Sequence, residues 1–385
     1  MAHTRLILAV AIAAFSTSAN AQSVRRMKLT ERQATFHEPF SRVTGVRELA
    51  DGSLIVADRL EQAIRIVDLR AGTMEDVGRV GGGPGEIQMP GAIFPLPGDS
   101  TLLLDFGNLR LSVIAPNGRI SHSTAMLTPE GSLINPTGVD AQGRIYFDDG
   151  GMRVGPNGAI ETSLRAPILR MTWGTMSLDT VAYLPMPEPS GSSQSIAMNG
   201  GQFQIQGMAP LPKKATWAVA LDGRVAVVNA DPYRVEWFDH GRSTQGPVVQ
   251  YEPVRVTRED KDAWADRMGG GGGVMIAMDG GGGGGRSGSS TMRLPRPDPD
   301  DMEWPEVKPP FSQNAARVAP DGALWVQRSV AHGEPQLFDV FDGSGVRVRQ
   351  VELLPGRQIV GFGDGVVYVV NVDEDELQWL EAYER

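Results

Sequence analysis

A short motif recurs six times along the chain: a turn such as Asp-Gly, then an apolar, β-branched run that ends in a polar residue. Asp-Gly supplies the positive φ that a tight hairpin requires, so each copy predicts a hairpin whose second strand is the apolar run. A unit that recurs about every 40 to 50 residues is the signature of a propeller or a solenoid. The six copies span residues 51–58, 101–105, 142–148, 222–229, 321–327 and 364–371.

A third strand follows most copies and completes the pattern of a propeller blade. These third strands are expected at 63–68, 109–115, 234–238 and 336–341. The pattern predicts an all-β fold, a six-bladed β-propeller with four-stranded antiparallel blades. Because a ring of sheets must join its ends or leave an exposed edge, we expect residues 24–36 to supply the fourth strand of the last blade, clasped against the C-terminus.

Two intervals between copies are too long for one blade. The first, between Asp148 and Asn229, contains predicted strands at Pro167–Met171 and Thr180–Leu184, and a seventh, degenerate blade is an alternative there. The second, between Asn229 and Gln327, contains an insertion at 257–310 that joins blades four and five.

The insertion begins like a helix and continues as a glycine- and proline-rich segment. Thr257 and Asp260 form a capping-box pattern that predicts a short helix to about Met268. Two glycine runs and the proline-rich residues 295–310 follow. This composition indicates a flexible segment that is mobile or extended rather than packed.

One connector resembles a known repeat. Residues 78–86, Gly-Arg-Val-Gly-Gly-Gly-Pro-Gly-Glu, followed by Pro90, resemble the connector of NHL-type six-bladed propellers, and Val56-Ala57-Asp58 resembles a strand of the same repeat. The first blade matches closely, while the other five keep only the strand rhythm. The chain is most similar to secreted bacterial six-bladed propellers related to NHL and TolB-like repeats, a group largely without assigned activity. A phosphate-binding loop is the competing interpretation, but the Gly-Lys-Ser/Thr ending is missing, which favours a tight bend between blades.

The first residues have the pattern of a signal peptide. A basic segment ending at Arg5 precedes an apolar run at 6–15, and Ala19-Asn20-Ala21 has the form that signal peptidase accepts. We expect a signal peptide at 1–21, cleaved after Ala21, and a single propeller domain at 22–385, periplasmic or secreted. An uncleaved anchor is the alternative. No later apolar run approaches the roughly 20 residues of a spanning helix, so no membrane span is expected after cleavage.

Composition removes several classes of function. The chain has no cysteine, which excludes disulfides, thiolate metal sites and cysteine nucleophiles. A net charge of −10 argues against a nucleic-acid partner. No two histidines have a paired spacing, so a zinc or copper centre is not expected. We expect a monomer.

A ring of polar residues at the ends of the second strands is the predicted ligand-binding site. In a propeller these strand ends share one face with the connections between blades, and therefore with the insertion. The alternative is that each residue only caps the turn that follows it. For the insertion, too, two interpretations are open: a lid over the ligand site, or a passive surface loop. The six residues are Asp58, Asp105, Asp148, Asn229, Gln327 and Asn371.

These features predict a non-enzymatic binding protein for a small molecule, a glycan or a peptide, with no catalytic residue and no cofactor assigned. The alternative is a lactonase-like, calcium-dependent hydrolase or a lyase on the same scaffold, where Ca²⁺ would be held by carboxylate and amide oxygens. The ligands of that family do not match this chain position by position. Trp264 and Trp304 of the insertion either dock it onto the body or contact a ligand.

Overall fold

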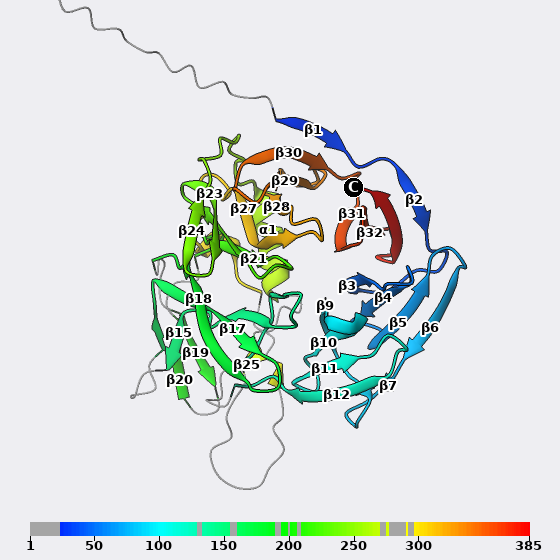
Figure 1. Cartoon of the computed structure of the whole chain (residues 1–385). Helices are drawn as coiled ribbons and strands as arrows, with labels where there is room; N and C mark the ends of the chain where they lie inside the picture. Colours follow the sequence, from blue (N-terminus) through cyan, green and yellow to red (C-terminus); the bar gives the residue numbers. More distant parts are fainter. Residues whose placement is uncertain are drawn as a thin grey trace, which may run out of the picture.

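Six four-stranded antiparallel sheets stand around a central axis, so the chain is a six-bladed β-propeller, as the repeats predict (Figure 1). The computed structural model describes residues 24–128, 133–154, 160–188, 194–198, 201–205, 209–269, 275–276, 290–291 and 296–385. The signal-peptide prediction and the two glycine runs of the insertion lie outside these residues. Among the described helices, none is both long and apolar enough to cross a membrane.

Each of the first three blades is a meander in chain order. Blade 1 consists of β3 (Val43–Glu48), β4 (Leu54–Asp58), β5 (Ala63–Asp68) and β6 (Thr73–Val77). Blade 2 consists of β9 (Pro90–Pro95), β10 (Thr101–Asp105), β11 (Arg110–Ile114) and β12 (Ile120–Ala125). Blade 3 consists of β13 (Gly138–Val139), β14 (Ile145–Asp148), β17 (Arg165–Thr172) and β18 (Ser177–Pro185).

The other three blades close the ring. Blade 4 consists of β21 (Thr216–Val219), β22 (Val225–Ala230), β23 (Tyr233–Asp239) and β24 (Arg242–Gln245). Blade 5 consists of β27 (Phe311–Val318), β28 (Leu324–Arg328), β29 (Leu337–Phe341) and β30 (Arg347–Glu352). Blade 6 consists of β31 (Arg357–Phe362), β32 (Val366–Val372), β33 (Gln378–Glu384) and β2 (Arg32–Thr35).

The second strand of a blade is apolar throughout because both of its faces are covered. In β4, for example, all five residues are buried: Leu54 and Val56 pack towards blade 6, while Ile55 and Ala57 pack towards blade 2. Side chains of a strand alternate between the two faces of its sheet, and in a ring each face meets a neighbouring blade. The core is therefore divided into layers between successive blades. This arrangement explains why the repeats appear as continuous apolar runs.

The long interval after Asp148 holds no additional blade among the described residues. The predicted strands Pro167–Met171 and Thr180–Leu184 lie within β17 and β18, which complete blade 3. Two separate two-stranded hairpins occupy other parts of the interval: β15 (Met152–Val154) with β16 (Ile160–Thr162), and β19 (Gln194–Met198) with β20 (Gly201–Ile205).

The N-terminal segment closes the ring, as predicted. Strand β2 pairs antiparallel with β33, and the N–H of Phe36 donates to the carbonyl of Leu380 at 2.9 Å. An additional strand, β1 (Arg25–Lys28), pairs parallel with β30 at the outer edge of blade 5. Figure 1 shows both strands (dark blue) running around the outside of blades 5 and 6. We call β1 and β2 with their flanking residues 24–36 the clasp.

A buried carboxylate ties the clasp to blade 6. Glu381 is 2% exposed, and it accepts hydrogen bonds from Arg32 at 2.9 Å, Arg357 at 3.1 Å and the Tyr383 hydroxyl at 2.8 Å. Burial acts to raise the pKa of Glu381, but these donors outweigh it and lower the pKa below its ordinary value.

The lowered pKa of Glu381 predicts a loss of stability in acid. A carboxyl with a depressed folded-state pKa contributes stability that is present above the unfolded-state pKa, about 4.3, and is lost as the pH falls through the folded-state pKa. Urea unfolding between pH 7 and pH 3 should therefore show a shallower acid slope for Glu381→Gln than for the wild type. The exposed Glu384→Gln should keep the wild-type slope. Identical slopes for wild type and Glu381→Gln would contradict this role.

Candidate functional site

The two faces of the propeller differ in how elaborate their loops are. The second strands all end on one face, which also carries the connections from the outer strand of one blade to the inner strand of the next; we call it the connector face. The opposite face, with the hairpin turns between first and second strands, is the turn face. Three long connections, from β14 to β17, from β18 to β21 and from β24 to β27, start and end on the connector face. Long surface loops on a rigid scaffold are where binding sites concentrate.

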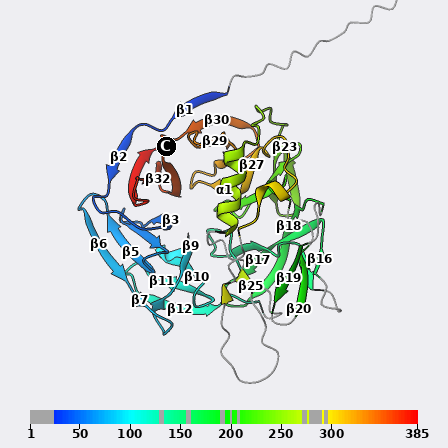
Figure 2. The ribbon, with the colours of Figure 1, turned by 180° about the vertical axis from the view of Figure 1, so that it is seen from behind.

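The insertion lies on the connector face and begins with the predicted helix, α1 (Arg258–Gly269) (Figure 2). The helix starts with the predicted capping box: the Thr257 N–H donates to the Asp260 carboxylate at 3.0 Å, and the Asp260 N–H donates to the Thr257 hydroxyl at 3.4 Å. Lys308, from the returning segment, donates to Asp260 at 2.6 Å and to the Val330 carbonyl of blade 5 at 2.7 Å. The helix is thereby tied to the body.

The described ends of the insertion are packed, which differs from the expectation of an extended segment. Trp264 of α1 meets Trp304 edge to face, with ring centroids 5.4 Å apart, and the Trp304 indole donates to the Pro299 carbonyl at 2.7 Å. Two backbone hydrogen bonds join the residues just before the insertion to those near its end: the Val256 N–H donates to the Glu306 carbonyl at 3.0 Å, and the Lys308 N–H donates to the Val254 carbonyl at 2.7 Å. The tryptophans dock the two ends of the insertion on each other. Flexibility of the insertion as a whole stays a prediction.

In the predicted ring, the two carboxylates of blades 1 and 2 have a structural use. Asp58 is 0% exposed and accepts from the backbone N–H groups of Ser41 at 2.8 Å and Arg42 at 3.0 Å. Asp105 is 1% exposed and accepts from the Met89 N–H at 3.0 Å and the Asn108 side chain at 2.6 Å. Each carboxylate therefore fixes the backbone that enters the innermost strand of its own blade. This geometry favours the structural interpretation for both residues.

The other four ring residues are half-buried at or next to the ends of their second strands. Asp148 accepts from the Gly150 N–H and from the Trp217 indole, each at 2.9 Å, so it joins blades 3 and 4. Asn229, Gln327 and Asn371 occupy the second-last positions of β22, β28 and β32. A ligand role for the ring stays a prediction.

The start of β27 presents polar side chains that the sequence analysis did not select. Phe311 pairs with Arg328 and Ala316 with Val326, so five steps along β27 oppose two along β28. The additional residues form a bulge in which Ser312, Gln313 and Asn314 are exposed, with Asn314 at φ 57°. Because β27 is the innermost strand of blade 5 and starts at the connector face, the bulge lies at the mouth of the central channel, directly after the insertion.

Exposed polar residues also begin other inner strands. Asn135 and Thr137 precede β13 of blade 3, and Gln358 is the second residue of β31 in blade 6. Their amides and hydroxyls both donate and accept hydrogen bonds. With the bulge, they place polar groups of blades 3, 5 and 6 at the mouth of the channel, as the strand order requires. The sequence contained one signal for these site residues: three consecutive polar residues, Ser-Gln-Asn, at the start of a strand that follows a long insertion.

Arg328 makes several contacts next to the bulge. The Arg328 Nε donates to the Pro310 carbonyl at 2.7 Å, and its guanidinium lies over the Tyr251 ring at 4.7 Å. Tyr251 precedes the insertion by six residues and Pro310 is its last residue, so one side chain contacts both flanks. Arg328 also pairs with the Asp339 carboxylate at 3.1 Å, to which the Tyr233 hydroxyl of blade 4 donates at 2.9 Å. Burial, and then the charge of Asp339, hold the pKa of Tyr233 well above its ordinary value, so the phenol stays a donor.

The glycine-rich connector has the structural role that the sequence favoured. The Glu86 carboxylate accepts from the Gly83 N–H at 2.6 Å, and the Asn108 side chain donates to the Gly81 carbonyl at 3.0 Å. Arg110 donates to the Gly83 carbonyl at 3.1 Å. The loop is thus a bend between blades 1 and 2, held by side chains of both its own residues and blade 2.

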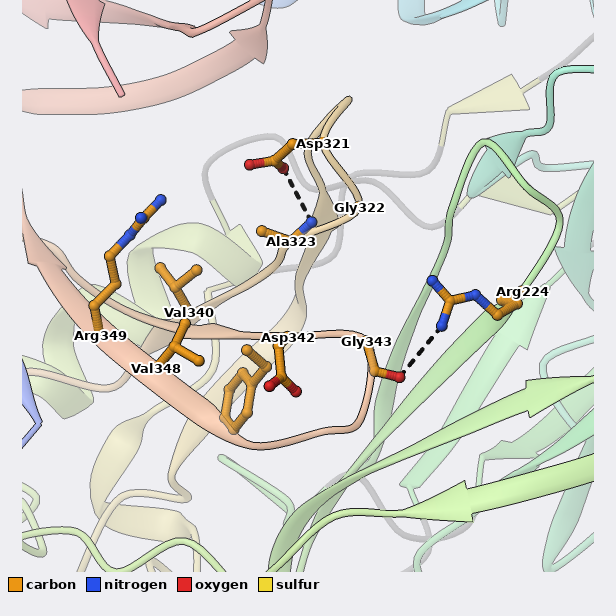
Figure 3. A pocket seen from close by; sticks show the side chains of 10 residues that line it. Arg224, Asp321, Gly322, Ala323, Val340, Asp342, Gly343, Val348 and Arg349 are labelled. Carbon is orange, nitrogen blue, oxygen red and sulfur yellow. Dashed lines mark hydrogen bonds between the residues drawn. The ribbon is translucent and has the colours of Figure 1, made fainter. Parts of the chain in front are cut away.

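A hollow of about 230 Å³ lies on the turn face, at the end of blade 5 (Figure 3). Val340, Phe341 and Val348 form its apolar part, and Arg224 and Arg349 stand at two sides. The Arg224 guanidinium donates to Asp222 at 2.8 Å and to the Gly343 carbonyl at 3.2 Å. Arg349 has no carboxylate partner within the described part of the chain.

The carboxylates that the structure describes do not form a metal site. Across those residues, no three side chains of His, Cys, Asp or Glu gather around one point. Asp58 and Asp105, two of the carboxylates at the strand ends, are directed at backbone N–H groups. The described residues therefore do not fit a carboxylate-based calcium site at the strand ends.

Comparison with known proteins gives the fold alone. No family model and no curated protein matches the chain. Similar solved structures include a gluconolactonase from Xanthomonas campestris, with 11% identity over 92% of this chain and 93% of that chain and a TM-score of 0.40. A calcium-binding protein, regucalcin, from Agrobacterium tumefaciens has 13% identity over 94% and 97%, with a TM-score of 0.36. Virginiamycin B lyase from Staphylococcus aureus has 12% identity over 91% and 85%, with a TM-score of 0.35. At such values these proteins share the propeller with this chain and add no argument about its function.

Proposed function

We propose that the protein is an exported, non-enzymatic binding protein that holds a polar ligand, a glycan or a peptide, at the connector-face mouth of its channel. The observation that carries the proposal is the bulge of β27, where Ser312, Gln313 and Asn314 are exposed on a base fixed by Arg328. Hydroxyl and amide groups on a rigid support suit a neutral ligand rich in hydrogen-bonding groups.

The loops around the bulge also favour the connector face as the ligand-binding face. The three long connections start and end on this side, and α1 is tied to blade 5 through Lys308, four residues before Ser312. The turn face has short hairpin turns instead. The relation to NHL and TolB-like repeats and the export of the protein remain parts of this proposal, supported by the first connector and by the N-terminal sequence pattern.

The triple variant Ser312→Ala, Gln313→Ala, Asn314→Gly tests the proposal. Glycine at position 314 keeps the positive φ, so the fold should survive while the hydrogen-bonding groups are removed. Neutral oligosaccharides and short peptides are first screened by thermal melting of the wild type, and the affinity of those that bind is measured by calorimetry. We expect the triple variant to bind at least about tenfold more weakly, since each lost hydrogen bond is worth about 0.5–1.5 kcal/mol.

Gln142→Ala is the matched control, because it removes an exposed amide from the turn face. It should bind like the wild type. Equal affinity of wild type and triple variant would refute the proposed site. A large rise of the melting temperature with calcium chloride would instead favour the calcium-dependent hydrolase or lyase.

A further inference from the structure

The innermost strands of the propeller carry arginines, although the chain as a whole has a net charge of −10. The innermost strands β3, β9, β13, β21, β27 and β31 contain three arginines, Arg47, Arg317 and Arg357, and one acidic residue, Glu48. Arg47 pairs with Asp99 at 2.6 Å, and Arg357 pairs with Glu381 at 3.1 Å. Arg317 has no carboxylate partner in the described part of the chain.

Arg317 is exposed on the innermost strand of blade 5. Its guanidinium donates to the Ile359 carbonyl of the neighbouring inner strand β31 at 2.8 Å. The side chain therefore reaches from one inner strand to the next beside the central channel, with a positive charge that no carboxylate of the described residues neutralises.

The cation and the polar bulge belong to the same strand. Arg317 follows Asn314 by three residues on β27. Since β27 runs from the connector face into the ring, Arg317 lies deeper in the channel than the bulge. A ligand bound at the mouth could therefore reach the guanidinium with one end.

We infer that Arg317 binds a carboxylate of the ligand, so that the protein selects a polar molecule with an acidic end that enters the channel. This inference rests on the proposed function and names its ligand class. A carboxylate accepts two parallel hydrogen bonds from a guanidinium, which is stronger and more selective than a contact with a neutral group. Two sources carry this chemistry, an acidic sugar and a peptide with a free C-terminus.

The experiment compares matched probes by calorimetry. A trigalacturonate is compared with its methyl ester, and trialanine with trialanine amide, on the full mature protein. For one pair, the free carboxylate should bind the wild type at least about tenfold more tightly than its neutral counterpart. Which pair shows this preference identifies the source. Arg317→Gln should remove the preference, and Arg317→Lys should keep part of it.

Arg349→Gln is the matched control, because Arg349 is an arginine without a carboxylate partner beside the turn-face hollow (Figure 3). It should keep the preference for the carboxylate. The inference is overturned if Arg317→Gln keeps the preference, if Arg349→Gln loses it, or if the wild type shows none. When neutral probes still bind through the bulge, only the role of Arg317 fails; when no probe binds at all, the proposed function fails with it.

Discussion

Deletion of the clasp, residues 24–36, is expected to abolish the cooperative unfolding of the propeller. Without β2, blade 6 keeps three strands and β33 becomes an open edge. The deletion also removes Phe36, which is 1% exposed, and Leu29, which is 8% exposed. Circular dichroism during urea unfolding should show a broad or absent transition. A sharp transition at the wild-type midpoint would contradict the closure of the ring by this segment.

Phe36→Ala is a smaller change in the same segment, and its effect on stability can be measured as a free energy. Phe36 packs with Phe40 and the blade 6 residues Tyr368 and Leu380, so its loss leaves a cavity between the clasp and the ring. We expect the free energy of unfolding to fall by about 3–5 kcal/mol. Leu60→Ala, at a residue 68% exposed, should change it by less than about 0.5 kcal/mol.

Asp339→Asn is expected to lower the free energy of unfolding by about 3–5 kcal/mol, since it leaves buried arginines without their carboxylate. Asp339 is 0% exposed and pairs with Arg328 at 3.1 Å and Arg347 at 3.2 Å. The Gln350 amide and the Tyr233 hydroxyl also donate to it. The measurement is the free energy of unfolding in urea at neutral pH.

Asp76→Asn is the control for this variant, because the Arg65–Asp76 pair is at the surface with Asp76 72% exposed. A surface pair is worth about 0–1 kcal/mol. Since Arg328 also contacts Tyr251 before the insertion and Pro310 at its end, Asp339→Asn should expose the insertion to faster cleavage in limited proteolysis. Equal stabilities of the two variants would show that the Asp339 network adds nothing beyond a surface ion pair.

The sequence was informative wherever the determining contacts are local or repeated. Asp-Gly turns, apolar second strands and the Thr257 capping box all depend on a few adjacent residues, and the structure has each of them. The clasp followed from a general requirement, that a closed sheet must satisfy its last edge.

The candidate site could not be predicted in the same way because it depends on pairings between distant residues. Asp58 accepts from the Glu61 N–H in the turn that follows it, but its two shorter bonds come from the backbone N–H groups of Ser41 and Arg42, which precede it by 17 and 16 residues. The exposure of Ser312–Asn314 results from a register shift between β27 and β28. Asp339 stands within an ordinary strand sequence, Leu-Phe-Asp-Val-Phe, and only the ring brings Tyr233 of blade 4 against it.

Amide hydrogen exchange, with and without the tightest-binding oligosaccharide or peptide of the screen, is the most direct test of a ligand site at the mouth of the channel. A probe bound at the connector-face mouth should slow exchange at residues 311–317 and leave the turn-face residues 319–323 and 342–349 unchanged. Slower exchange confined to those turn-face residues would place the ligand in the hollow beside Arg349 instead and refute a site at the connector face.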